Sequence, residues 1–310
     1  MRARTPRALG RAISIVEDGG EPARELMAAI ATATSGARVL GITGSPGVGK
    51  STTTSALIDF HRRAGRTVAV LACDPSSPFS GGALLGDRVR MQEHFLDTGV
   101  YIRSMSSRGH LGGLSASTPQ AARLLDAAGF DIIIIETVGV GQSEVEVAAA
   151  ADTTVVLLAP GMGDGIQAVK AGILEVGDIF VVNKADRDGA HETVRELRHA
   201  LSLAADVRAR PAEPDEWVPP ILLTVASTGQ GIPELAAAVD DHGAWLVGTE
   251  PGRQRRARRA QAELEAVLLA QLRARVGAFR DDPRFQQLAA EVGQGLRDAY
   301  SAAEVLVSRL

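Results

Sequence analysis

The sequence predicts an α/β protein in which helices flank a central, mostly parallel sheet. Short β-branched apolar runs alternate with helical patterns from residue 38 to about residue 238, which is typical of successive βαβ units. The four isoleucines at 132–135 do not alternate with polar residues, so we expect a central strand buried on both faces. Apolar residues make up 45% and charged residues 23% of the chain, as in ordinary globular proteins. The expected strands are 39–43, 67–73, 100–103, 131–135, 153–159, 179–182 and 221–224.

We expect three parts along the 310 residues. Residues 1–37 form a short N-terminal helical segment with one helix at 21–34, and residues 38–242 form the α/β domain. Residues 243–310 form a C-terminal helical extension, because a glycine-rich stretch with Pro251 precedes a helical pattern that breaks near Pro283. The apolar positions of this extension are too few for a core of their own, so we expect them to pack on another surface. A second copy of the chain is the simplest candidate, which makes this a dimerisation extension.

Composition and charge argue against several classes of protein. The net charge of −4 and the aromatic content of 4% give no general attraction to phosphate backbones and little surface for base stacking, so we expect no nucleic-acid partner. The single cysteine, Cys73, excludes an internal disulfide and a thiolate-built metal site and indicates a reducing compartment, the cytoplasm. No apolar run has the roughly eighteen residues of a membrane span. The Arg-rich start lacks the apolar core of a signal peptide, which leaves a short transit peptide as the alternative.

A glycine-rich motif follows the first expected strand. Residues 44–51 fit the pattern G-x-x-x-x-G-K-[ST] and precede a helical pattern, which is the context of a P-loop that binds a nucleoside triphosphate. Glycines let backbone N–H groups converge on phosphate, Lys50 supplies positive charge, and the Ser51 hydroxyl is an expected Mg²⁺ ligand. The alternative is a plain glycine-rich turn. The expected phosphate-binding residues are Gly44, Ser45, Pro46, Gly47, Val48, Gly49, Lys50, Ser51, Thr52 and Gly139.

A second motif, Asn183-Lys184-Ala185-Asp186, follows the apolar run at 179–182, so it lies at the end of a strand where α/β sheets bind ligands. The Asp186 carboxylate can accept from N1–H and the exocyclic amine of guanine, whereas adenine presents an unprotonated N1 at that place. This favours GTP over ATP. Asn183 is placed to tie this loop to the P-loop, and the stem of Lys184 to lie over the purine. The alternative is a polar strand end with an ordinary turn.

Acidic residues at strand ends are candidates for Mg²⁺ and switch chemistry. Glu136 follows the isoleucine strand and either holds a Mg²⁺-bound water or orients the attacking water, while the N–H of Gly139 meets the γ-phosphate. Asp74 ends another strand, and Asp87 follows a Pro/Ser/Gly loop at 75–82 that we interpret as a nucleotide-sensing switch. The alternatives are a capping carboxylate and an ordinary loop.

Two basic features are open to more than one interpretation. Lys170 follows a second glycine-rich stretch, 160–165, and is either a mobile catalytic or signalling cation or a solvated helix lysine. The stretch 253–259 contains five arginines, and we expect a solvated helix face there rather than a site for an acidic partner. The six histidines form no closely spaced pair of metal ligands.

These motifs together resemble one family, the GTPases associated with adenosylcobalamin-dependent methylmalonyl-CoA mutase, called MeaB or ArgK in bacteria and MMAA in human mitochondria. The likeness extends over residues 41–241, through the segments 44–52, 73–77, 107–118, 136–144, 160–170 and 183–186. The resemblance implies a P-loop NTPase fold, GTP/GDP and Mg²⁺ as ligands, and a homodimer paired through the C-terminal helices. It also implies a chaperone that gates loading of adenosylcobalamin into the mutase, protects that enzyme and supports its reactivation.

The resemblance implies roles for individual residues. It makes Asp74, Asp87 and Glu136 the Mg²⁺ and switch carboxylates and puts Lys170 in a third switch that reads the partner. Val225 stands where GTPases commonly have serine, so only the guanine contact of Ala226 is carried over, and the segment before the P-loop is short for the family. The candidate sets are then Lys50, Asp87, Glu136 and Lys170 for catalysis, Ser51, Asp74, Asp87 and Glu136 for metal, and Asn183, Lys184, Asp186 and Ala226 for guanine.

Hydrolysis by the isolated protein is expected to be slow. Gln142 lies three residues after Gly139 instead of next to it, where a Ras-type water-positioning glutamine would be, and no arginine is placed as a finger in cis. We therefore expect the mutase to complete the site.

Three other functions fit the same motifs. A nickel-delivery GTPase would need Cys/His metal sites, against which the single cysteine and scattered histidines argue. A kinase of a transport-binding protein would transfer the γ-phosphate to protein, and a purely structural dimer would keep the nucleotide as a static cofactor. Methylmalonyl-CoA mutase is the first candidate among the adenosylcobalamin-dependent acyl-CoA mutases that share the cofactor.

Overall fold

The computed structural model describes residues 4–74, 92–106, 117–137, 143–161, 171–207, 215–278 and 282–307. The chain forms two compact units, Met1–Arg256 and Ala257–Leu310, and each is described by itself. The first unit holds the sheet and the sequence motifs described above, and the second is helical.

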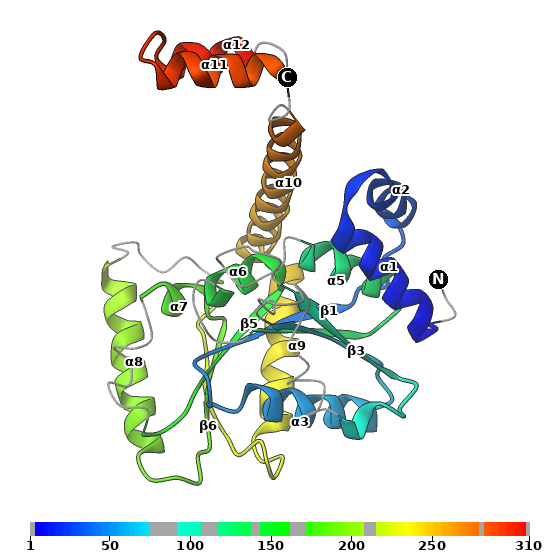
Figure 1. The fold of residues 1–310 in the computed structure, drawn as a ribbon. Helices are drawn as coiled ribbons and strands as arrows, with labels where there is room; N and C mark the ends of the chain where they lie inside the picture. The colour runs from blue at the N-terminus through cyan, green and yellow to red at the C-terminus, as the bar shows by residue number, and fades with distance from the viewer. Residues whose placement is uncertain are drawn as a thin grey trace. The chain divides into compact units, whose positions relative to one another are not determined.

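A seven-stranded sheet, parallel at every pair, is the centre of the first unit (Figure 1). Its strand order is β3-β2-β4-β1-β5-β6-β7. Every residue of β4 is buried, because β4 lies between β2 and β1 and helices cover both of its faces. This confirms the predicted fold class and the central place of the isoleucine strand. The strands are β1 Arg38–Thr43, β2 Val68–Asp74, β3 Val100–Ser106, β4 Ile132–Thr137, β5 Thr153–Leu158, β6 Ile179–Asn183 and β7 Ile221–Thr224.

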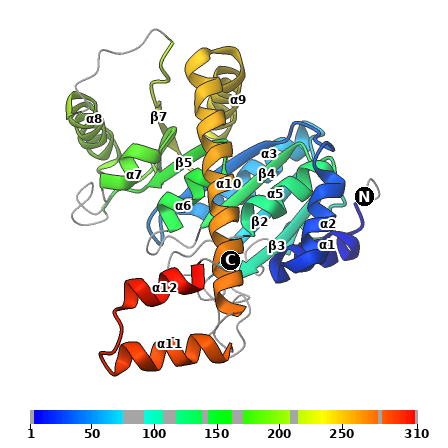
Figure 2. The same ribbon diagram turned by 90° about the horizontal axis from the view of Figure 1, so that it is seen from above.

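Two layers of helices bury the two faces of the sheet. On one face α3 and α9 cover side chains such as Ile134, and on the other α1, α5 and α6 cover side chains such as Ile133 (Figures 1 and 2). The alternation follows from the strand itself, since successive side chains point to opposite faces. The helices of this unit are α1 Pro6–Asp18, α2 Gly20–Ile30, α3 Lys50–Arg63, the 3₁₀ turn η1 Gln92–His94, α5 Thr118–Ala127, α6 Ser143–Ala150, α7 Ala171–Val176, α8 Ala190–Val207 and α9 Ile232–Gly248.

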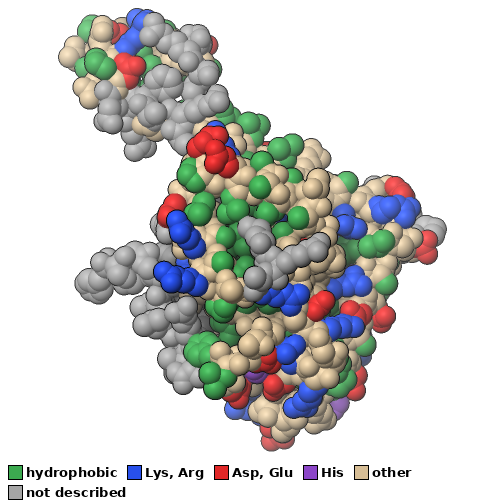
Figure 3. Space-filling view, turned by 90° about the vertical axis from the view of Figure 1, so that its right-hand side faces the viewer, with side chains coloured by type: hydrophobic (Ala, Val, Ile, Leu, Met, Phe, Trp, Pro, Cys, Tyr) green, Lys and Arg blue, Asp and Glu red, His purple; other side chains and the backbone are tan. Residues whose placement is uncertain are grey.

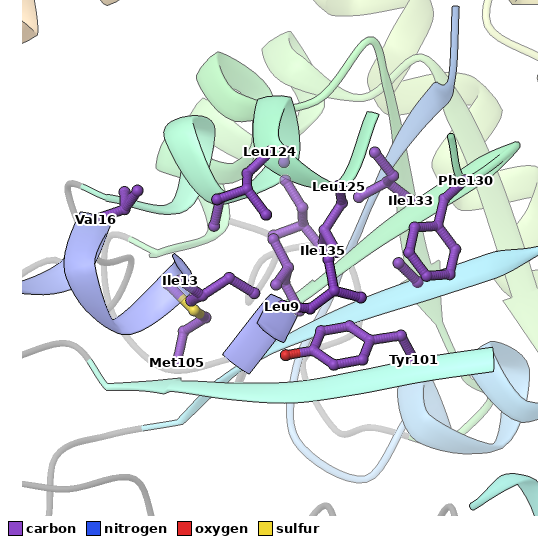
Figure 4. Close-up of a cluster of buried hydrophobic side chains, with 14 of the residues drawn as sticks. Leu9, Ile13, Val16, Tyr101, Met105, Leu124, Leu125, Phe130, Ile133 and Ile135 are labelled. Carbon is purple, nitrogen blue, oxygen red and sulfur yellow. The ribbon is translucent and has the colours of Figure 1, made fainter. Parts of the chain in front are cut away.

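The N-terminal segment contains two helices, whereas we predicted only one, at 21–34. That helix is α2, which ends at Ile30, and α1 precedes it after a turn at Gly19 with a positive φ of 72°. Leu9 and Ile13 of α1 are buried against Tyr101 of β3 and other residues of that face (Figure 4). The Arg-rich composition of the start hid this helix, although its buried residues recur at helical spacing.

A buried cluster of aromatic and charged side chains, which includes both tryptophans, lies beside the first turns of α10. His242 of α9 is fully buried between Trp217 and Trp245, with ring centroids 4.7 and 5.3 Å from its own. Asp178, just before β6, is buried as well and pairs with Arg255 of α10 at 2.5 Å. Burial lowers the pKa of His242 to about 3. Burial also raises the pKa of Asp178, and the nearby Arg255 guanidinium acts against that rise. Arg255, which we predicted to lie on a solvated helix face, is therefore an ion-pair partner of a buried carboxylate.

The glycine-rich stretch at 243–252 is helical apart from Thr249, because α9 continues to Gly248 and α10 (Glu250–Ala278) begins at once. A Cβ at Gly243 would meet the guanidinium end of the Arg38 side chain, which packs against α9 there. In the second unit, α11 (Pro283–Gly293) and α12 (Ala299–Val307) pack together and bury Leu288 and Ala302. The Asp282 side chain caps α11 by accepting from the Arg284 N–H at 2.8 Å.

The surface of the protein mixes charges of both signs. On the face shown in Figure 3, Lys and Arg side chains are interspersed with Asp and Glu side chains. Within the described residues, every helix is too short or too polar to cross a bilayer.

Candidate functional site

The predicted P-loop joins β1 to α3, the strand and helix at the middle of the first unit. Gly44, Gly47 and Gly49 have φ values of 138°, 83° and 100°, which side chains with a Cβ rarely adopt. A Cβ on Gly44 would collide with the Leu157 carbonyl oxygen, and one on Gly49 with the Asn183 side chain. The loop is therefore a close-packed turn whose backbone shape depends on glycine, as a phosphate cradle requires.

Lys50 begins α3 and is buried within this loop. Its Nζ donates to the carbonyl oxygens of Gly44 at 2.7 Å and Ser45 at 3.1 Å. The ammonium group thus lies over the loop backbone, where the phosphates bound by such a loop would be. It would exchange some of these carbonyl contacts for phosphate oxygens when nucleotide binds.

Glu136 is brought directly to the start of α3, although 85 residues separate it from Ser51 in sequence. The Ser51 hydroxyl donates to Oε1 of Glu136 at 2.6 Å, and the Thr54 hydroxyl donates to Oε2 at 2.7 Å. The Glu136 side chain is almost completely buried, with 3% of the residue exposed. Because the Ser51 proton points at the carboxylate, the lone pairs of its oxygen are left to face a cation. A hydroxyl oxygen beside a carboxylate is the hard-oxygen donor set that Mg²⁺ prefers, so these residues fit that ion.

Asn183 connects the second motif to the P-loop, as the sequence predicts. Its amide Nδ2 donates to the Val48 carbonyl oxygen at 2.8 Å, and its Oδ1 accepts from the Thr224 hydroxyl at 3.1 Å and the Ala226 N–H at 3.0 Å. The side chain is buried, so these bonds are shielded from water. One amide therefore holds three loops in place, those after β1, β6 and β7.

The other guanine-motif residues surround this connection. Lys184 has a φ of 58°, and its Nζ donates to the Gly47 carbonyl oxygen at 2.6 Å, which lays its stem along the P-loop. Asp186 is exposed, so its carboxylate is accessible to a ligand. The Ala226 N–H is directed at Asn183, so a guanine contact from it would be shared with that side chain.

A groove of 570 Å³ adjoins these loops, a volume within the range of small-molecule sites. It runs along α3 from Ser51 to Arg63 and is closed by Glu93 and by residues 226–229. The Ser55 hydroxyl, in its wall, donates to Glu93 at 2.7 Å, which docks η1 on α3. Of the predicted site residues, Ser51, Thr52 and Ala226 line this groove.

Several predicted residues lie outside the described part of the chain. These are Asp87, Gly139 and Lys170, together with the loop at 75–82. Asp74 is the last residue of β2, which places its backbone at the same edge of the sheet as Glu136, but its side chain is not described.

Two residues of the site, Thr54 and Thr224, were not predicted from the sequence. Thr54 lies three residues after Ser51, a spacing that places both on one face of a helix. Thr224 ends β7 next to Asn183 in the sheet register. Helical spacing was the available signal for Thr54, whereas the contact of Thr224 depends on strand order.

Comparison with known proteins agrees with this geometry. A family model described as methylmalonyl Co-A mutase-associated GTPase MeaB matches residues 9–280. The chain belongs to this family. It is 43% identical over 304 residues to a protein of Pyrococcus abyssi that is named as a GTPase, which covers 98% of this chain and 93% of that protein.

Two further matches have the family's characteristic names. GTPase ArgK of Escherichia coli is 43% identical over 223 residues, covering 72% of this chain and 66% of that protein. A crystal structure described as LAO/AO transport system kinase matches with a TM-score of 0.66 and 27% identity over 99% of this chain and 94% of that one. This MeaB-family chain is therefore a P-loop GTPase that binds guanine nucleotide, and the predicted family and activity are confirmed.

Proposed function

We propose that this GTPase is a chaperone of an adenosylcobalamin-dependent acyl-CoA mutase, methylmalonyl-CoA mutase in the first instance. It would gate loading of the cofactor, protect the mutase and support its reactivation. The observation that supports this most is the family match, which spans most of the chain and is described by association with that mutase. A cytoplasmic location fits the single, buried cysteine, Cys73.

The phosphates of GTP would bind in the P-loop, residues 44–52. Lys50 would move from the Gly44 and Ser45 carbonyls to the β- and γ-phosphates, and Ser51 with Glu136 would hold Mg²⁺ and its water. A bound Mg²⁺ neutralises charge that develops on the phosphate oxygens. Asp74, Asp87 and the Gly139 N–H would complete this end of the site.

Guanine would be recognised by the loops that Asn183 joins. The exposed Asp186 carboxylate would accept from the two guanine donors, Lys184 would cover the base, and Ala226 would contribute its N–H. Since Asn183 bonds directly to Val48 of the P-loop, base and phosphate contacts share one rigid support.

The GTPase would be slow alone and stimulated by the mutase. Gln142 lies three residues after Gly139 in the sequence and not next to it, and the expected switch residues Asp87 and Lys170 would respond to the partner. Coupling hydrolysis to recognition would let one GTP molecule accompany one loading event.

We further propose a homodimer paired through the C-terminal extension. Five apolar side chains of α10 are exposed by between 37% and 69% of their surface: Leu264, Leu268, Leu269, Leu272 and Val276. Four of them, Leu264, Leu268, Leu272 and Val276, follow one another at intervals of four residues, about one helical turn, and form a stripe along α10. A second copy of the same stripe is a complementary partner for such a surface.

The test is GTP hydrolysis by the purified protein, with and without the mutase from the same source, and with ATP as the control nucleotide. Stimulation by the mutase for GTP alone is the expected result. Binding of GTP without any stimulation, and without a change in cofactor loading, would refute the chaperone proposal while leaving the GTPase in place.

A kinase is the second candidate, because one structural match is described as a transport system kinase. Labelled γ-phosphate separates the two: a kinase transfers it to a protein, whereas the proposed GTPase releases it as inorganic phosphate.

A further inference from the structure

The Glu136 carboxylate is held by α3 at both of its oxygens. Ser51 donates to Oε1 at 2.6 Å and Thr54 donates to Oε2 at 2.7 Å. The Ser51 bond is slightly short for a hydroxyl donor, and the Thr54 bond has the ordinary length. The Thr54 side chain is completely buried, so water does not compete for this contact.

The two hydroxyls have different tasks in a P-loop enzyme. The Ser51 oxygen is the one that can face a cation, so its own position changes with metal binding. Thr54 lies almost one turn further along α3 and away from the P-loop, so its hydroxyl can keep its bond to Glu136 whether or not metal is present.

We propose that Thr54 is a positioning residue for GTP hydrolysis, whose hydroxyl fixes Oε2 of Glu136 so that Oε1 stays directed at Ser51 and the Mg²⁺ site. This inference deepens the proposed nucleotide site and rests on the role of Glu136 in it. Without the Thr54 hydroxyl, Oε2 loses this hydrogen bond, so the direction of Oε1 is held less tightly.

The neighbouring Thr53 supplies a matched comparison. It is equally buried and on the same helix, but its hydroxyl donates to the Gly49 carbonyl oxygen at 3.0 Å, an ordinary helix contact. If buried threonine hydroxyls in α3 serve only to satisfy polar groups, removing either one should have the same effect. If Thr54 positions Glu136, only its removal should change the metal dependence.

The experiment compares Thr54→Val, Thr54→Ser and Thr53→Val in the full chain. It measures GTP hydrolysis against Mg²⁺ concentration, and the release of a fluorescent GDP with Mg²⁺ or with EDTA. We expect Thr54→Val to lower kcat or to raise the Mg²⁺ requirement by about 10- to 100-fold, as for other residues that support a metal site.

The controls separate positioning from packing. GDP affinity in EDTA should be unchanged in Thr54→Val, and Thr54→Ser, which keeps the hydroxyl, should resemble the wild type, as should Thr53→Val. Wild-type Mg²⁺ dependence in Thr54→Val would overturn the inference, and so would a Thr54→Ser variant as impaired as Thr54→Val. If GDP release from the wild-type protein does not depend on Mg²⁺, both the role of Thr54 and the metal assignment are overturned. If the mutase does not stimulate hydrolysis, only the chaperone proposal is overturned.

Discussion

Replacement of Asn183 by alanine should destabilise the protein even without nucleotide. The amide makes three hydrogen bonds that join the P-loop to the loops after β6 and β7. Each such bond contributes about 1 kcal/mol net, and the buried Val48 carbonyl and Ala226 N–H are left without this partner, which costs more. We therefore expect a loss of about 4 kcal/mol, a large share of the roughly 5–15 kcal/mol of a typical domain.

The assay is urea unfolding of the nucleotide-free protein followed by circular dichroism, together with the affinity for a fluorescent GDP. Thr224→Val provides a graded comparison, because it removes only one of the three bonds and should cost about 1 kcal/mol. Thr193 is half-buried, and its hydroxyl donates to the Gly189 carbonyl oxygen just before α8, so Thr193→Val removes one local bond and should leave the unfolding free energy nearly unchanged. An Asn183→Ala protein that unfolds within about 1 kcal/mol of the wild type would refute the reasoning, since other contacts would then hold the loops.

Three further predictions concern the same domain. Burial lowers the pKa of His61 to about 4 and that of His242 to about 3. Below pH 6.5 the unfolded chain therefore binds protons that the folded protein does not. In urea unfolding, the free energy of unfolding should be lower at pH 5 than at pH 7 by about 2 kcal/mol per histidine. Arg255→Ala leaves the buried Asp178 without its cation and should cost about 3 kcal/mol by the same assay. Gly49→Ala combines a φ of 100° with a collision and should abolish GDP binding measured by calorimetry.

Each of these predictions has a control in the chain. His61→Leu should flatten the pH dependence of the unfolding free energy, because it removes one of the two buried histidines. Arg258 lies on the same helix as Arg255 but is exposed. If Arg258→Ala lowers the free energy of unfolding as much as Arg255→Ala does, the ion-pair explanation is contradicted. Gly36→Ala also has a positive φ, but with open space around it, so GDP binding should survive that change.

The strands and the nucleotide motifs were predictable because each depends on local sequence. β-branched runs form strands wherever they lie in the sheet, and the P-loop pattern at 44–51 specifies its own strand–turn–helix context. The link from Asn183 to the P-loop was also predicted correctly, because both motifs follow strands of one parallel sheet, β1 and β6, and so lie at the same edge of it.

The features that escaped prediction depend on three-dimensional context. α1 begins in an arginine-rich segment, and what stabilises it is burial of Leu9 and Ile13 on the sheet, which no local propensity reports. The bond from Thr54 to Glu136 joins positions 82 residues apart, and the pairing of Arg255 with Asp178 joins a helix of the C-terminal part to a strand start. Threonine and arginine are ordinary surface residues by composition, and only the fold distinguishes these two.

The placement of Trp217 and Trp245 has a spectroscopic consequence. They are the chain's two tryptophans, and their ring centroids lie 5.9 Å apart beside His242. All of the indole emission of the native protein therefore comes from this one corner, at the base of α10 and next to the Asp178–Arg255 pair. Intrinsic fluorescence is thus a label-free reporter of the first turns of α10, and any nucleotide- or client-driven change there would be observable in the unmodified protein.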